Sequence, residues 1–190
     1  MVVADGPRQT RVAAPATDVT LRGARDTVSL LGAADLHVLR AAGSRVYGVD
    51  SGTGAFVTSA DGGRSWQQRT PPAAVVDLAI APSDSTRVVA ATRTGLLLST
   101  DTGRTWRALR RGLTGLLAWP NADALYLVAA DGAVWRSTDG GLEFTRGGSV
   151  GAEAEAVAAN GPRELYAAVH GGTVLVSTDG GAHWQIRSTP

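Results

Sequence analysis

The chain has 190 residues, which is enough for one domain with a sizeable core. Its 18 basic and 17 acidic residues leave a formal net charge of +1, so the composition does not favour binding to nucleic acid or to an anionic membrane. Cysteine is absent, which excludes disulfides, thiolate catalysis and Cys-ligated zinc but does not distinguish reducing from oxidising compartments.

Targeting signals are not evident in the sequence. No apolar run is long enough to span a membrane, and the N-terminus, MVVADGPRQTR, contains no apolar segment of signal-peptide length. The chain as it stands is therefore expected in the cytoplasm. The protein is expected to be exported if an N-terminal signal has been lost or removed.

The first 34 residues differ from the rest of the chain. Residues 11–14, 19–22 and 27–31 favour short strands, but they lack the motif that recurs afterwards. From residue 35 on, four segments align: SADGGRSW at 59–66, STDTGRTW at 99–106, STDGGLEF at 137–144 and STDGGAHW at 177–184. Their first serines recur at intervals of 38 to 40 residues, which indicates a repeat architecture.

The sequence around each motif repeats as well. Three short apolar runs separated by turn residues precede the motif, and a short polar run follows it. Each unit therefore predicts four antiparallel strands joined by tight turns, and roughly 40 residues per such unit is typical of a propeller blade. The predicted fold is an all-β propeller with four blades, at about residues 35–70, 71–112, 113–150 and 151–190. Residues 1–34 are expected to form either a degenerate blade or ring-closing strands.

The motif resembles the Asp-box, Ser-x-Asp-x-Gly-x-Thr-Trp, of the BNR-repeat superfamily. That superfamily includes sialidases, sortilin-type receptors, xyloglucan-cleaving enzymes and photosystem II assembly-factor-like propellers. The chain most resembles bacterial glycosyl-hydrolase-like BNR-repeat proteins. The second copy matches the pattern fully, whereas Ser65, Glu143, Phe144 and His183 depart from it. The resemblance implies that the boxes lie on the propeller rim, away from a central ligand site.

The box residues are predicted to be structural. Asp and Ser side chains can accept or donate hydrogen bonds within a turn, Gly permits positive φ, and the large aromatic ring can fill the gap between blades. This interpretation covers Ser59, Asp61, Gly63, Trp66, Ser99, Asp101, Gly103, Trp106, Ser137, Asp139, Gly141, Phe144, Ser177, Asp179, Gly181 and Trp184.

Catalytic patterns are weak. Tyr47, Tyr126 and Tyr166 recur at one position of the second strand, which indicates packing residues and not a sialidase nucleophile, and the Arg-Ile-Pro motif of sialidases is missing. Residues 147–151 (GGSVG) match the nucleophile-elbow pattern but are expected in a flexible loop between blades. No catalytic residues are therefore predicted.

The three histidines have no metal-ligand spacing, so neither a metal site nor a cofactor is predicted. His37 lies on a predicted innermost strand and is expected to be an interior residue, and His183 is expected to be exposed.

A ligand is expected on the face opposite the box turns, where the loops after the second strands gather. The candidate ligand-binding residues there are Asp50, Arg93, Asp131, His170 and Glu155. The predicted function is a non-enzymatic scaffold that binds a protein partner or a glycan. The alternative is a glycoside hydrolase whose catalytic residues are unrecognised or lie outside this chain. An open ring would expose strand edges and apolar blade faces and would favour self-association.

Overall fold

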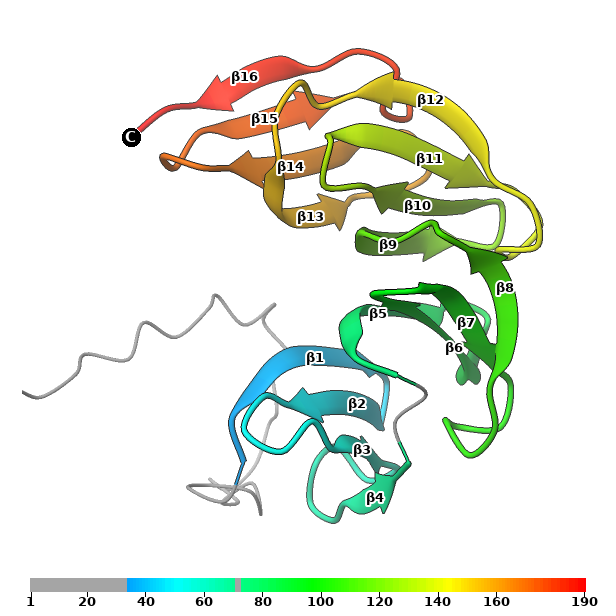
Figure 1. Cartoon of the computed structure of the whole chain (residues 1–190). Coiled ribbons are helices and arrows are strands. Elements are labelled where there is room, and N and C mark those ends of the chain that lie inside the picture. The colour runs from blue at the N-terminus through cyan, green and yellow to red at the C-terminus, as the bar shows by residue number, and fades with distance from the viewer. Residues whose placement is uncertain (1–33, 71–72) are drawn as a thin grey trace, which may run out of the picture.

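The computed structural model describes residues 34–70 and 73–190, which form strands arranged in four sheets (Figure 1). The N-terminal strand candidates at 11–14, 19–22 and 27–31 lie outside the described residues. The first and second sheets consist of β1 (Leu36–Ala42), β2 (Arg45–Asp50), β3 (Phe56–Ser59) and β4 (Gln67–Arg69), and of β5 (Val75–Ala81), β6 (Asp84–Thr92), β7 (Gly95–Ser99) and β8 (Arg107–Arg111). The third and fourth consist of β9 (Leu116–Asn121), β10 (Ala124–Val128), β11 (Ala133–Ser137) and β12 (Thr145–Ser149), and of β13 (Ala154–Ala159), β14 (Leu165–Val169), β15 (Val174–Ser177) and β16 (Gln185–Ser188).

Each sheet is an antiparallel blade whose strands pair in chain order, from an innermost to an outermost strand. The innermost strands pack in sequence, β1 against β5, β5 against β9 and β9 against β13. Figure 1 shows the four blades fanned around a common axis, with blade 4 (β13–β16) and blade 1 (β1–β4) at the two ends of the arc. The prediction of an all-β propeller with four four-stranded antiparallel blades is confirmed.

The hydrophobic core lies between blades, because alternate residues of each strand face opposite neighbours. Tyr47 and Phe56 of blade 1 pack with Leu78 and Val88 of blade 2 (β5–β8). Equivalent clusters join blade 2 to blade 3 (β9–β12) and blade 3 to blade 4. Burial of large side chains on both faces of the inner blades is what holds the arc together.

The box aromatics take part in these junctions. Trp106 packs back onto blade 1, where its ring meets Phe56 edge-on with centroids 5.5 Å apart. Phe144 packs back onto blade 2 and Trp184 onto blade 3. Each of these three aromatic residues therefore fills the gap between its own blade and the one before it.

Two expectations from the sequence were wrong. Gly147, Gly148 and Ser149 lie in β12, the outermost strand of blade 3, and not in a loop, because the chain pairs with β11 before it turns toward blade 4. His37 is not interior: its side chain is 72% exposed and lies 3.3 Å from Asp35. Side chains along β1 alternate between half-buried and exposed, and His37 occupies one of the exposed positions.

Candidate functional site

The four box turns have one common geometry. In each turn the serine hydroxyl donates to the aspartate Oδ1 and accepts the N–H of the glycine four residues later, at 2.8 Å. The aspartate also accepts backbone N–H groups from the end of the turn, as in the 3.0 Å bond from the His183 N–H to Asp179. All four carboxylates are thus engaged within their own turns.

The hydrogen bonds lower the pKa of these carboxyl groups. The Ser65 hydroxyl lowers the pKa of Asp61, the Thr105 hydroxyl that of Asp101, and the Ser137 hydroxyl that of Asp139. The backbone and ring of His183 lower the pKa of Asp179. Hydrogen bonds to the charged form favour ionisation, so these aspartates are not suited to donate protons near neutral pH.

The pKa shifts predict how stability depends on pH. Because the folded-state values lie below the ordinary value of 3.8, ionised box carboxylates stabilise the fold above pH 3.8, and this stabilisation is lost as the pH falls further. Thermal melts across the acid range should show a falling midpoint below pH 3.8. Asp179→Asn should make that fall shallower, and an unchanged profile would contradict the assignment.

Replacing the Asp179 side chain with a methyl group separates a structural role from a catalytic one. Asp179→Ala removes the acceptor for Ser177, Ala182 and His183, so the melting midpoint should fall by a few degrees. His183→Ala keeps the backbone bonds and should cost less. A variant Asp179→Ala that melts normally but loses a specific ligand would contradict the structural role.

The loops after the second strands lie on the face that carries the beginnings of the innermost strands. Leu36 at the start of β1 pairs with Asp50 at the end of β2. The box turns lie on the other face, where the Gly62 N–H donates to Ser44 O and the Gly180 N–H to Arg163 O. Both contacts join a box turn to the turn between the first two strands of the same blade.

The five candidate ligand residues lie in different surroundings. Asp50 is only 7% exposed and accepts bonds from Thr53, Gly52 and Asp35. The Thr53 hydroxyl and these N–H groups lower the pKa of Asp50, so this carboxylate organises its own loop. Asp131 is exposed and accepts the N–H of Ala133 at 2.9 Å, and Arg93 is exposed at the tip of its turn. Neither side chain lines the cavity between the innermost strands of the four blades.

His170 and Glu155 are the two candidates that the structure brings together. His170 Nδ1 lies 3.1 Å from Glu155 Oε1, and the two side chains are 98% and 59% exposed. Glu155 lies at the start of the innermost strand β13 and lines the central cavity. The pair therefore lies on the face opposite the box turns, with Glu155 lining the cavity and His170 bonded to it.

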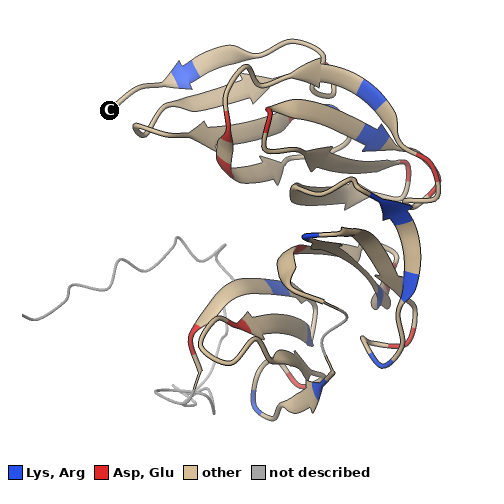
Figure 2. Ribbon diagram, in the orientation of Figure 1, with Lys and Arg blue, Asp and Glu red and all other residues tan. Residues whose placement is uncertain are grey.

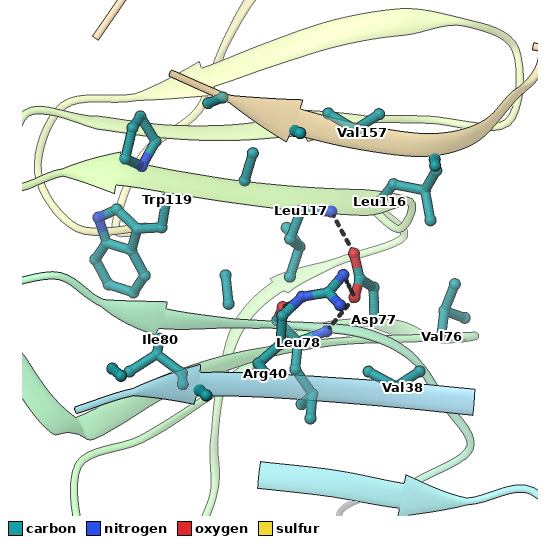
Figure 3. Close-up of a pocket in the computed structure, with 18 of the residues that line it drawn as sticks. Val38, Arg40, Val76, Asp77, Leu78, Ile80, Leu116, Leu117, Trp119 and Val157 are labelled. Atoms are coloured by element: carbon teal, nitrogen blue, oxygen red, sulfur yellow. Dashed lines mark hydrogen bonds and ion pairs between the residues drawn. The ribbon is translucent and has the colours of Figure 1, made fainter. Parts of the chain in front are cut away.

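The central cavity has a volume of about 900 Å³ and is lined by the innermost strands of all four blades. Figure 3 shows its mixed chemistry, with Val38, Ile80, Trp119 and Val157 around one ion pair.

Arg40 and Asp77 form that ion pair and join three blades (Figure 3). The Arg40 Nη2 group on β1 lies 2.5 Å from Asp77 Oδ1 on β5, and Arg40 Nε donates to Leu78 O at 3.0 Å. The second oxygen of Asp77 accepts the Leu117 N–H on β9 at 2.8 Å. Burial raises the pKa of Asp77 and the nearby Arg40 charge opposes that rise. The Asp77 side chain is 4% exposed and that of Arg40 is 39% exposed.

Sequence reasoning missed both residues of this pair. The signal for Asp77 was present, since it is a carboxylate within the apolar run VVDLAI of an innermost strand. A buried carboxylate needs a partner, but nothing local in the sequence points to Arg40, 37 residues earlier.

Several other kinds of site find no support in the part of the chain that the structure describes. Charged residues of both signs are dispersed over the blades in Figure 2. Residues 34–70 and 73–190 contain no group of three or more potential metal ligands. No helix among them could cross a bilayer.

The fold and the axial cavity define a protein of the β-propeller class. No protein-family model matches the sequence, and no curated protein matches it.

Solved propeller structures are similar to this chain. YCF48 from Cyanidioschyzon merolae matches with a TM-score of 0.62 at 17% identity, over 82% of this chain and 57% of its own. The GH74 enzyme of Niastella koreensis matches with 0.57 at 19% identity, over 75% and 22%. The GH74 xyloglucanase from Xanthomonas campestris matches with 0.54 at 19% identity, over 76% and 28%. This chain spans less than two thirds of each of these three chains, and similarities at such identities establish the fold alone.

Proposed function

We propose that this chain is a non-enzymatic propeller scaffold that binds a protein segment in its central cavity, entered from the face opposite the box turns. The observation that carries the proposal is the cavity of about 900 Å³ to which every blade contributes. Pockets for small molecules commonly have volumes of about 300–1,000 Å³, and this cavity lies at the upper end of that range. The half-exposed Val76 and Val157 suit the aliphatic side chains of an extended peptide, while Glu155 offers a negative charge to the ligand.

The chemistry of the lining favours binding over glycoside hydrolysis. A glycosidase of the usual kind needs two available carboxyl groups on either side of the scissile bond. The acidic lining residues are Asp77 and Glu155. Both oxygens of Asp77 are already bonded to Arg40 and to backbone N–H groups, which leaves Glu155 without a second free carboxylate. A glycan is the alternative ligand, and its binding is measured alongside that of peptides.

Selection from a random peptide library displayed on phage would test this function with the full chain. Selected peptides should share a motif and bind saturably. The variant Val76→Arg places a long charged side chain in the cavity from a position that is 39% exposed, and it should abolish binding. The matched control Leu142→Arg changes a 52% exposed apolar residue on a box turn and should bind as the wild type does.

Glycoside hydrolysis is measured on the same preparations of wild type and variants. The scaffold function would be overturned if the wild type hydrolysed xyloglucan, fluorogenic sialosides or β-glucosides and Val76→Arg did not. Peptides that bind both variants equally would place the binding surface outside the cavity. Saturable binding of oligosaccharides without hydrolysis would replace the protein ligand with a glycan.

A further inference from the structure

A second pocket lies on blade 2, which has neighbouring blades packed on both of its faces. Its volume is about 450 Å³, and it lies at one end of the hairpin formed by β7 and the outermost strand β8. We call it the β8 pocket. None of its residues lines the central cavity, and they are Thr94, Gly95, Leu96, Leu97, Ala108, Arg110 and Arg111.

A bulge in β8 shapes one wall of the β8 pocket. Gly95 pairs with Arg111 and Leu96 pairs with Arg110, and the register between the two strands shifts between Leu96 and Leu97. Consecutive side chains of a regular strand face opposite sides of the sheet. Because the strand is bulged at this point, the consecutive residues Arg110 and Arg111 both line the same pocket.

Hydrogen bonds hold the other wall in place. The Gly112 N–H donates to Thr94 O at 3.0 Å, which joins the end of β8 to the turn between β6 and β7. Inside that turn the Thr92 hydroxyl donates to Gly95 O at 2.7 Å. The walls are therefore formed without a ligand, as is usual for small-molecule sites.

Two arginines supply the charge of the β8 pocket. Arg110 and Arg111 are exposed, and within residues 34–70 and 73–190 no hydrogen bond or ion pair engages either side chain. No acidic residue is part of the lining, and Arg93 next to Thr94 adds a third positive charge. Figure 2 shows basic segments at both ends of β8. Guanidinium groups bind carboxylates and phosphates through paired hydrogen bonds, so the pocket suits an anion.

Aliphatic side chains supply the rest of the lining. Leu96 is fully buried, Leu97 is partly buried, and Ala108 leaves space above the strand because its side chain is small. A matching ligand therefore carries an aliphatic part besides its anionic group. The lining contains no aromatic side chain, on which the bases of a nucleic acid would stack.

The arginine pair is not part of the pattern that the blades repeat. A register shift also occurs between β11 and β12 and between β15 and β16, so the bulge belongs to the fold. At the position of Arg110, counted from the first serine of each box, the other blades have the uncharged residues Thr70, Gly148 and Ser188. The fold therefore requires the bulge but does not require a charge there.

Protection of the sheet edge does not account for the pair either. Charged side chains on an outer strand hinder its pairing with another chain. The outer strands of blades 1, 3 and 4 carry one arginine each, and Arg107 supplies one on β8. Arg110 and Arg111 are additional to it, and they are the arginines of β8 that line a pocket.

We propose that the β8 pocket binds a small organic anion, with its carboxylate or phosphate group held by Arg110 and Arg111 and its aliphatic part on Leu96 and Leu97. The volume of about 450 Å³ lies within the range of about 300–1,000 Å³ that is common for small-molecule pockets. A free small molecule and the C-terminal carboxylate of a peptide that ends in an aliphatic residue both carry this chemistry. The site is separate from the central cavity and does not rest on the function proposed for that cavity.

NMR titration of the isotope-labelled full chain tests the site. Hexanoate should shift the amide signals of Thr94, Gly95 and Leu97 saturably. Acetate lacks the aliphatic part and hexanol lacks the charge, so each should bind at least about tenfold more weakly than hexanoate. Hexyl phosphate and a short peptide with a C-terminal leucine are titrated in parallel. Tighter binding of the peptide than of either free anion would identify a protein terminus as the source, and the reverse order would identify a free small molecule.

Variants of exposed residues locate the binding on β8. Arg110→Gln and Arg111→Gln should each weaken hexanoate binding about tenfold through the lost charged hydrogen bonds. Ala108→Phe should fill the pocket and abolish binding. The matched control Arg146→Gln removes an exposed arginine from β12, the outer strand of blade 3, and should bind as the wild type does.

Three results would overturn the proposal. The first is a wild type whose signals none of the anions shifts. The second is an Arg110→Gln, Arg111→Gln double variant that binds as tightly as the wild type. The third is a set of shifts at Val76 and Leu117, which line the central cavity, in place of shifts at Thr94 and Gly95. The cavity variant Val76→Arg should keep hexanoate binding, so this site and the proposed function can fail independently.

Discussion

Asp77→Ala is expected to lower the free energy of unfolding by about 3 kcal/mol, because it leaves the Arg40 guanidinium and the buried Leu117 N–H without their acceptor. Asp77 is nearly fully buried and joins β1, β5 and β9, so its loss weakens two blade junctions together. Urea denaturation monitored by tryptophan fluorescence would measure the change. The control Asp123→Ala removes an exposed carboxylate and should stay within about 0.5 kcal/mol of the wild type.

The partner variant gives a different pH dependence. Arg40→Ala leaves the buried Asp77 carboxylate without its cation, so the pKa of Asp77 should rise further above its ordinary value of 3.8. Ionised Asp77 then costs stability near neutral pH, and the deficit of Arg40→Ala should shrink as the pH falls through that raised pKa. The double variant should lose less than the sum of the single variants. Strict additivity would show that the two residues act independently.

The propeller could be predicted from the sequence because its signals are local and repeated. Each box turn closes bonds within four residues, such as the one from the Gly181 N–H to Ser177 Oγ, so one short motif encodes one hairpin. The recurrence of Tyr47, Tyr126 and Tyr166 at one strand position likewise predicted packing residues. Tyr47 and Tyr126 are fully buried, and the structure adds hydroxyl bonds that reach the next blade.

The central cavity could not be predicted in the same way, because its partners come from different blades. Asp77 meets Arg40 and Leu117, which lie 37 residues before it and 40 residues after it. Those contacts depend on how much each blade is rotated relative to the next, which no local pattern encodes. Loop position alone also does not show what a charged side chain contacts, as Asp50 illustrates. Its carboxylate is bonded to Thr53 and Gly52 within its own turn, so a charged residue at a loop tip need not face a ligand.

The same distinction between local pattern and spatial context explains residues 147–151, the GGSVG segment. Gly148 lies in β12 against the box turn of blade 4, and a Cβ added there would overlap the carbonyl oxygens of Gly181 and Ala182. These are backbone atoms and cannot rotate away, so Gly148→Ala is expected to cost about 2–3 kcal/mol by forcing blades 3 and 4 apart.

The neighbouring Gly147→Ala is the matched control for Gly148→Ala. Its Cβ would lie 3.6 Å from Val134 O, an ordinary contact, so the stability should stay close to that of the wild type. Thermal and urea melts of the two variants would measure the difference. Equal stability of both would contradict the close approach of β12 to blade 4. A large difference would show that the second glycine of this segment is required by packing between blades and not by a nucleophilic serine beside it.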